Sequence, residues 1–392
     1  MAYDTAVNPS PARAALAGLA VLAVAMGIGR FAFTPLLPQM QQEVGLDVAA
    51  GGWLAAANYL GYLVGALTAA GREVRPAVAI RTALVVVGVS TAAMGAAGDF
   101  GAWLALRFAA GVASAWALVF TSAWCLERIQ AEAAPARKAH LAATLFAGVG
   151  TGIAVAGVTC LALFCAGVGA AAAWYVLGAL ALASAAALWN AFGSRPVLQS
   201  EAAVAGRPAG TLRMTLCYGA FGLGYIVPAT FIAAMARAAQ GTAAGGLYEW
   251  TWPLFGATAA ASTFIAGAAR TRWSDRRIWI VGALLMALGV VAPLAIAGFA
   301  GFALSALLVG GTFMVVTMTG IQEARRVAGP RARALIAAMT AAFAVGQIVG
   351  PLLVTLLPAP ADSPYASALW VAAAVLVLSA AALLPPRPKE SP

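Results

Sequence analysis

The sequence predicts an all-α integral membrane protein with twelve transmembrane helices in two pseudo-symmetric six-helix bundles. Three observations predict this fold. Of the 392 residues, 63% are hydrophobic and only 9% are charged, which excludes an ordinary water-soluble protein. Apolar runs of about 20 to 26 residues recur along the chain, each long enough to cross a hydrocarbon core of about 30 Å. Short segments also repeat half a chain apart.

The first apolar run, 14–38, is long enough for one tilted crossing, although it contains an arginine and two prolines. It exceeds the length of a signal-peptide core, so we expect an uncleaved first helix. Five further runs lie near 50–70, 77–97, 101–126, 139–164 and 169–192. A second set lies near 213–236, 248–269, 277–298, 300–322, 333–357 and 364–385.

The longest polar stretch, 193–212, separates the two sets and contains Gly, Pro, Ser and Gln, a composition typical of a linker. We therefore expect an N-terminal six-helix bundle over 1–192 and a C-terminal six-helix bundle over 213–392. The cytoplasmic linker between them is expected over 193–212.

The distribution of charge predicts the orientation in the membrane. The net charge of +10 comes from basic residues scattered between apolar runs, not from one patch, so no nucleic-acid partner is expected. Basic residues collect in the loops on one side, whereas the other side receives Glu43, Asp47, Asp99, Glu249 and Asp362. The positive-inside rule then places both termini in the cytoplasm. We expect a monomer in the lipid bilayer of a bacterial inner membrane.

Internal repeats support two related halves. The segment "GIGR" at 27–30 recurs as "GLGY" at 222–225, at an offset of 195 residues. The segment "PARKAHLAATLFAGVG" from Pro135 is similar to "PRARALIAAMTAAFAVG" from Pro330, and Glu127 matches Glu323. Because six is an even number, both halves enter the membrane from the same side, which indicates parallel repeats.

Twelve spans in two halves with a central linker resemble the major facilitator superfamily of secondary transporters. The segments "GIGRFAFTPLLPQMQ", "GWLAAANYLGYLVGAL", "LALRFAAGVASA" and "GLGYIVPATFIAAMAR" are similar to the YbfB/YjiJ-type branch. The resemblance implies a small-molecule substrate and places helices 1, 4, 7 and 10 around a central cavity. Two superfamily motifs are altered: Ala69 replaces an aspartate after helix 2, and helix 5 lacks the Gly-Pro pair of antiporters.

Two arginines, Arg30 and Arg107, lie well inside predicted spans, whereas none of the thirteen acidic residues does. Burying an arginine mid-bilayer costs about 2.5 to 3.5 kcal/mol on insertion scales, so something must meet each charge. On helical wheels Arg30 shares a stripe with Thr34, and Arg107 shares one with Ser114. Counted from the outer ends of their helices, Arg30, Asn58 and Arg107 lie at one level. Because guanidinium binds carboxylate in bidentate fashion, an anionic solute suits this site. The predicted substrate-binding residues are Arg30, Thr34, Asn58, Arg107, Ser114, Tyr225 and Gln347.

Structural interpretations of the same residues stand beside this one. Pro35 removes a helical hydrogen bond and frees the Phe31 carbonyl, so Arg30 could satisfy loosened backbone. Arg107 has a structural or gating interpretation, and Asn58, Thr34 and Ser114 are residue types that commonly join membrane helices. Tyr225 and Gln347 are open to the same interpretation.

At the cytoplasmic helix ends we expect salt bridges that break on gating, formed by Glu127, Arg128, Glu323 and Arg325. The sequence shows no nucleotide-binding motif, no metal-ligand spacing and one histidine, so we expect neither an enzyme nor a cofactor. A secondary transporter of a small organic anion is the first hypothesis. The alternatives are proton-coupled efflux of amphipathic or drug-like compounds, and a non-transporting membrane sensor or scaffold.

Overall fold

The structure is a computed structural model that describes residues 9–69, 75–193, 211–240, 246–270, 272–360 and 363–384. In the first half, one continuous helical run contains α1 (Pro11–Leu22), the wider helix η1 (Ala23–Phe31) and α2 (Phe33–Val44). It is followed by α3 (Val48–Ala69), α4 (Pro76–Ala96), α5 (Phe100–Gln130), α6 (Pro135–Cys165) and α7 (Ala170–Ala187).

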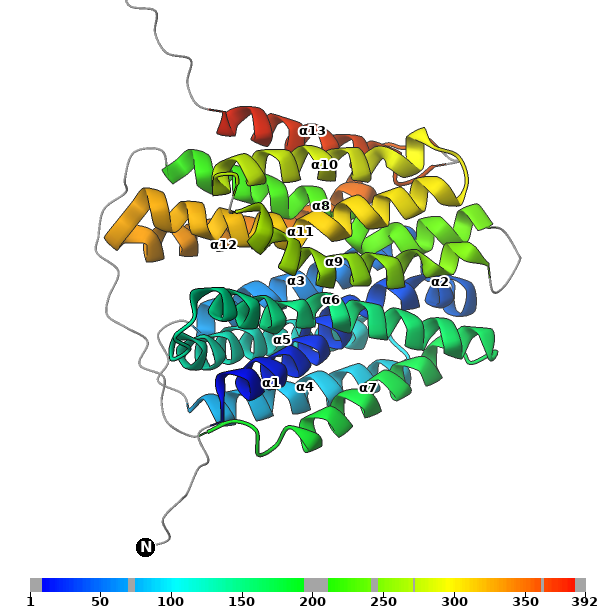
Figure 1. The fold of residues 1–392 in the computed structure, drawn as a ribbon. Helices are drawn as coiled ribbons and strands as arrows, with labels where there is room; N and C mark the ends of the chain where they lie inside the picture. Colours follow the sequence, from blue (N-terminus) through cyan, green and yellow to red (C-terminus); the bar gives the residue numbers. More distant parts are fainter. Residues whose placement is uncertain are drawn as a thin grey trace, which may run out of the picture.

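The second half repeats this order. It contains α8 (Thr211–Gln240), the short helix η2 (Leu247–Trp250) leading into α9 (Thr251–Ala269), α10 (Asp275–Ala295), α11 (Phe299–Ala328), η3 (Gly329–Arg331), α12 (Ala332–Leu356) and α13 (Ala366–Leu383). Figure 1 shows α8 to α13 lying over the helices of the first half. Of the predicted linker, 194–210 lies outside the described residues, as do Asp362 and most of the loop after helix 2.

The twelve predicted spans are confirmed as helices. Ten of the described runs are long and apolar enough to cross a membrane. The other two, α3 and α9, are 22 and 19 residues long and occupy equivalent positions in the two halves. Both pack against the opposite half, α3 on α12 and α9 on α6, so protein replaces lipid along part of their surface. Their lower hydropathy follows from that position.

Several helices extend beyond the predicted apolar runs. The run predicted at 101–126 continues to Gln130 in α5, and the run predicted at 300–322 continues to Ala328 in α11. The extra turns carry charged residues that solvent or ion pairs can satisfy. Hydropathy alone marks the apolar part of a helix, which is shorter than the helix itself.

Packing within each half follows the same plan. α1 and η1 pack on α6 as α8 packs on α12, and the α3–α5 and α4–α7 pairs correspond to α9–α11 and α10–α13. The equivalent glycines approach neighbouring backbone closely. A Cβ atom added at Gly27 would lie 2.2 Å from the carbonyl carbon of Gly152, and one added at Gly222 would lie 2.3 Å from the carbonyl oxygen of Phe343. Both halves therefore use a glycine to seat their first helix.

The bundle has two ends, which we name from the chain. The terminal face carries the start of α1 at Pro11 and the end of α13 at Leu383, both at the left of Figure 1. The distal face carries Val44 and Leu247. Acidic side chains cap helices that begin at the distal face: Asp47 accepts from the Ala50 N–H, Asp99 from the Ala102 N–H and Glu43 from the Ala170 N–H. These caps complement the helix dipoles.

Contacts between the halves are unequal along the first helix. Its distal part, α2, packs against α8, whereas its terminal part, α1, packs against α5 and α6 of its own half. At the distal end of α3, a Cβ atom at Gly52 would lie 3.0 Å from the Pro351 carbonyl oxygen of α12. The halves are therefore joined at the distal end of the first helix.

We predict that Gly27→Ala and Gly222→Ala each destabilise the protein by about 1 to 3 kcal/mol, because the added methyl group must displace neighbouring backbone. Thermal unfolding of the purified protein in detergent measures the effect. Gly311→Ala is the matched control, since nothing lies within 4 Å of its Cβ position in α11. Wild-type stability of Gly27→Ala would contradict the packing described.

Candidate functional site

The first helix is locally widened where it carries Arg30. The segment η1 is a nine-residue π-helix, in which each carbonyl pairs with the N–H five residues on instead of four. Arg30 lies at the end of this segment, and Pro35, which has no N–H to donate, follows in the first turn of α2. The wide turns and the proline together interrupt the regular hydrogen bonding of the helix around Arg30.

Side chains from α3 and α5 supply donors to this part of the backbone. Arg107 donates from Nη2 to the Arg30 carbonyl at 3.0 Å and from Nη1 to the Gly29 carbonyl at 3.4 Å. Asn58 donates to the Gly29 carbonyl at 3.3 Å and to the Arg107 carbonyl at 2.8 Å. Ser114 donates to the Ala25 carbonyl at 2.7 Å. Three buried polar side chains thus hold the wide turn in place.

This network gives the two buried arginines different roles. The predicted level shared by Arg30, Asn58 and Arg107 agrees with these contacts. The structural interpretation of the sequence made the Arg30 side chain the donor to backbone loosened by Pro35. The arginine whose hydrogen bonds reach this backbone is Arg107, which donates to the Arg30 and Gly29 carbonyls.

The Arg30 side chain is only 2% exposed and lies among aromatic rings. Its guanidinium carbon is 4.3 Å from the ring centroid of Tyr62, 5.0 Å from that of Tyr59 and 5.1 Å from that of Phe31. A cation–π contact with a desolvated guanidinium contributes about 2 kcal/mol. None of the ion pairs among the described residues includes Arg30.

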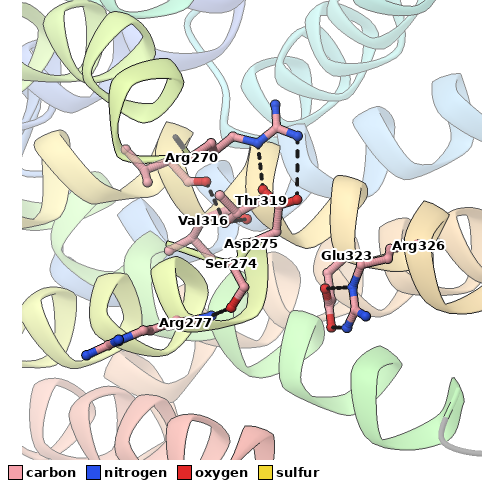
Figure 2. Close-up of polar contacts among 9 residues, drawn as sticks. Arg270, Ser274, Asp275, Arg277, Val316, Thr319, Glu323 and Arg326 are labelled. Atoms are coloured by element: carbon pink, nitrogen blue, oxygen red, sulfur yellow. Dashed lines mark hydrogen bonds and ion pairs between the residues drawn. The ribbon is translucent and has the colours of Figure 1, made fainter. Parts of the chain in front are cut away.

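Two nitrogens of Arg30, Nε and Nη2, are buried without a hydrogen-bond partner. These two atoms form one edge of the guanidinium plane. The same edge binds carboxylate elsewhere in this protein, as Figure 2 shows: Arg270 donates from Nε and Nη2 to Asp275, and Arg326 donates from Nε and Nη2 to Glu323. Arg30 has an unused edge of the kind that takes a carboxylate in bidentate fashion.

The second half contributes a stacked aromatic cluster. Tyr225 of α8 stacks on Phe313 of α11 at 5.5 Å and on Phe343 of α12 at 5.6 Å between ring centroids. Gln347 donates a hydrogen bond to the Tyr225 hydroxyl. The Arg30 guanidinium is close enough to interact electrostatically with Tyr225. Arg30, Tyr225 and Gln347 therefore lie in one region.

Two hydrogen bonds join the halves beside this cluster. The Thr34 hydroxyl donates to the Ala229 carbonyl at 2.7 Å, across an offset of 195 residues. The Tyr59 and Thr230 hydroxyls are hydrogen-bonded at 3.0 Å. Thr34 therefore contacts the opposite half, whereas Asn58, Arg107 and Ser114 bond within their own half.

Sequence reasoning missed four aromatic residues of the site. Tyr59 and Tyr62 contact Arg30, and Phe313 and Phe343 stack on Tyr225. A signal existed for the tyrosines. Tyr62 follows Asn58 by four residues and therefore shares its helix face, and Tyr59 lies beside that face. No comparable signal marks the phenylalanines among the many apolar residues of α11 and α12.

The predicted gating residues are distributed unequally. Glu323 is 1% exposed and pairs with Arg326 at 2.6 Å, whereas Arg325 is exposed. Glu127 is 59% exposed at its side chain and lies 3.8 Å from Arg128. The paired arginine in the second half is thus Arg326, which lies one helical turn from Glu323 and on its face.

Comparisons with known proteins agree with this architecture. A family model described as an uncharacterised MFS-type transporter, YbfB, matches residues 22–384. A search of curated proteins returned no match.

Similar solved structures share the fold at low sequence identity. Two are a bacterial homologue of the human lysosomal transporter Spinster, inward-facing and unoccupied or occupied, with 15% and 16% identity and TM-scores of 0.71 and 0.73. They cover 96% and 94% of this chain, which covers 97% and 95% of theirs. A variant of the nucleoside transporter NupG has 14% identity, a TM-score of 0.70, and coverage of 93% of this chain and 98% of its own.

We expect removal of Arg107 and removal of Arg30 to change the stability of the protein differently. Arg107→Met removes the side-chain donor of the Arg30 carbonyl and leaves the Gly29 carbonyl with Asn58 alone, so we predict a loss of about 1 to 3 kcal/mol in stability. Arg30→Met removes a buried charge that has no carboxylate partner, so we predict unchanged or higher stability. Denaturation temperatures in detergent without added solute measure both. An equal loss in the two variants would contradict the division of roles.

Proposed function

We propose that this chain, which belongs to the YbfB-type family of major facilitator transporters, carries a small organic anion and binds its carboxylate at Arg30. The observation that carries this proposal is the buried Nε–Nη2 edge of Arg30, which lacks a hydrogen-bond partner. Leaving a buried charged donor unsatisfied is costly, and a carboxylate would satisfy both nitrogens at once. Charge and hydrogen bonding then point to the same class of ligand.

The surroundings of Arg30 suit a solute that must later leave. A protein carboxylate in this position would occupy the Nε–Nη2 edge in place of the solute, as Glu323 occupies that edge of Arg326. The rings of Phe31, Tyr59 and Tyr62 instead stabilise the charge without filling its free edge. Arg30 can therefore remain buried between transport events and still offer a binding edge.

The position of Arg30 between the halves supports alternating access. The bonds from Thr34 to Ala229 and from Tyr59 to Thr230 join the halves close to the site. In our proposal the described state is closed at the distal face, and these bonds break when that face opens. The moving bodies are the two bundles, 1–192 and 213–392, as the sequence analysis expects.

The orientation follows from the charge distribution. Acidic residues cap helices at the distal face, and the basic loops lie toward the terminal face. We therefore place the terminal face in the cytoplasm and the distal face outside the inner membrane.

Efflux of amphipathic or drug-like compounds is the second candidate, and the aromatic cluster favours it. Tyr225, Phe313 and Phe343 present a large apolar surface near the site. This candidate includes coupling to protons. Among the described residues, the most deeply buried acidic side chain is that of Glu323, which is paired with Arg326. Dependence on Arg30 separates the candidates, since a neutral amphipathic compound gains nothing from its free edge.

We predict that Arg30→Lys lowers carboxylate transport by about tenfold to hundredfold, because lysine keeps the charge but loses the bidentate edge. The measurement is uptake by proteoliposomes of a panel of radiolabelled carboxylates, with the corresponding neutral amides as controls. Arg277→Lys, at an exposed site on α10, should retain wild-type transport. Undiminished carboxylate transport by Arg30→Lys and Arg30→Ala would overturn the proposal.

A further inference from the structure

A largely apolar pocket that contains one ion pair lies on the distal side of Arg30, between the two halves. Helices α2, α6, α8 and α9, two from each half, enclose it together with η2. Its lining includes Pro35, Cys160, Arg237, Glu249 and Trp252. Its free volume of about 50 Å³ is far below the roughly 300 to 1,000 Å³ of pockets for drug-sized ligands. Only a small solute, or one end of a larger one, fits in the described state.

The pocket contains a charged pair with an unused acceptor. Arg237 donates to Glu249 Oε1 at 2.6 Å, and the two side chains are 22% and 17% exposed. The second carboxylate oxygen, Glu249 Oε2, is buried without a hydrogen-bond partner. A carboxylate oxygen accepts hydrogen bonds only, so this atom calls for a donor such as a hydroxyl or an ammonium group.

Trp252 provides the complementary unused donor. Its side chain is 1% exposed, and its indole Nε1 has no hydrogen-bond partner. A buried indole N–H usually finds an acceptor, and a solute carboxylate is a strong one. Glu249 and Trp252 thus line one pocket with opposite and unsatisfied hydrogen-bonding needs.

Trp252 also forms part of the partition between this pocket and Arg30. Its ring lies 6.2 Å from the Phe31 ring, and the Phe31 ring centroid lies 5.1 Å from the Arg30 guanidinium carbon. Pro35, on the pocket wall, is five residues from Arg30 on the same helical run. The pocket therefore lies next to the Arg30 site along the first helix.

We infer that this pocket is a second binding site for the transported carboxylate, and that this solute also carries a hydroxyl or ammonium group. Trp252 Nε1 donates to the solute carboxylate, and Glu249 Oε2 accepts from the hydroxyl or ammonium. The inference rests on the proposed function, since it assigns the same solute to both sites. It narrows the substrate class to small hydroxy or amino acids.

Indole NMR signals test this inference on the full chain in detergent. Lactate, alanine and propionate share a three-carbon acid and differ only at carbon 2, where they carry hydroxyl, ammonium or hydrogen. With ¹⁵N-labelled tryptophan, Trp252 is identified by the signal missing from Trp252→Phe. We expect lactate or alanine to shift this signal saturably, and propionate to bind at least about tenfold more weakly, because it lacks a donor for Glu249.

Internal controls come from the same spectrum. Trp124, Trp174 and Trp279 also have buried indole nitrogens without partners, but they are not among the residues lining the pocket, so their signals should not move. Glu249→Gln should remove most of the preference for alanine over propionate. A Trp252 signal unmoved by lactate and alanine, or moved equally by propionate, would overturn the inference.

Arg30→Ala distinguishes failure at the two sites. If the Trp252 shift persists in this variant, the distal pocket binds independently of Arg30, as inferred. If the shift disappears, the signal reports binding at Arg30 instead, and the second site is wrong while the proposed function stands. Loss of transport with a retained Trp252 shift supports both.

Discussion

The hydrogen bonds from Arg107 to the backbone of the first helix are the interaction on which the site depends. The first helix is irregular here, with a π-helical segment ending at Phe31 and Pro35 following it, and Arg107 Nη2 donates to the Arg30 carbonyl within this stretch. Asn58 links the Gly29 carbonyl to the Arg107 carbonyl, so α3, α5 and the first helix are fixed together. Without these donors, a wide turn in the membrane would expose unsatisfied carbonyls. The side chain of Arg30 stays free because another arginine serves its backbone.

The sequence was sufficient for the helices and for the level of the polar residues. Length and hydropathy gave twelve runs, and the offset of 195 residues anticipated equivalent packing of Gly27 and Gly222. Depth counted along each helix correctly brought Asn58 and Arg107 to the first helix near Arg30. These features depend on local periodicity and chain length, which a single sequence records.

The register of the first helix could not be predicted from the sequence. A wheel of 100° per residue assumes α-helical turns, whereas the segment that carries Arg30 is a π-helix. Arg30 then faces Tyr59 and Tyr62 of its own half, while Thr34 bonds Ala229 of the other. The widening is stabilised by side chains 29 to 89 residues away, so no local pattern reveals it. The pairing of Glu323 with Arg326 was missed for the simpler reason that two adjacent arginines compete for one carboxylate.

The bond between Thr34 and Ala229 bears on how two equivalent halves can differ. Residues separated by the repeat offset meet on the pseudo-two-fold axis, where an exact dimer would place two copies of one residue. A single directed hydrogen bond cannot obey that symmetry, since one partner donates and the other accepts. Likewise, an exact dimer would bring a second arginine to position 225, facing the charge of Arg30. Joining the halves in one chain allows one to carry the charge and the other to provide the aromatic ring. The repeat therefore gives the architecture, and divergence at its axis gives the site one polarity.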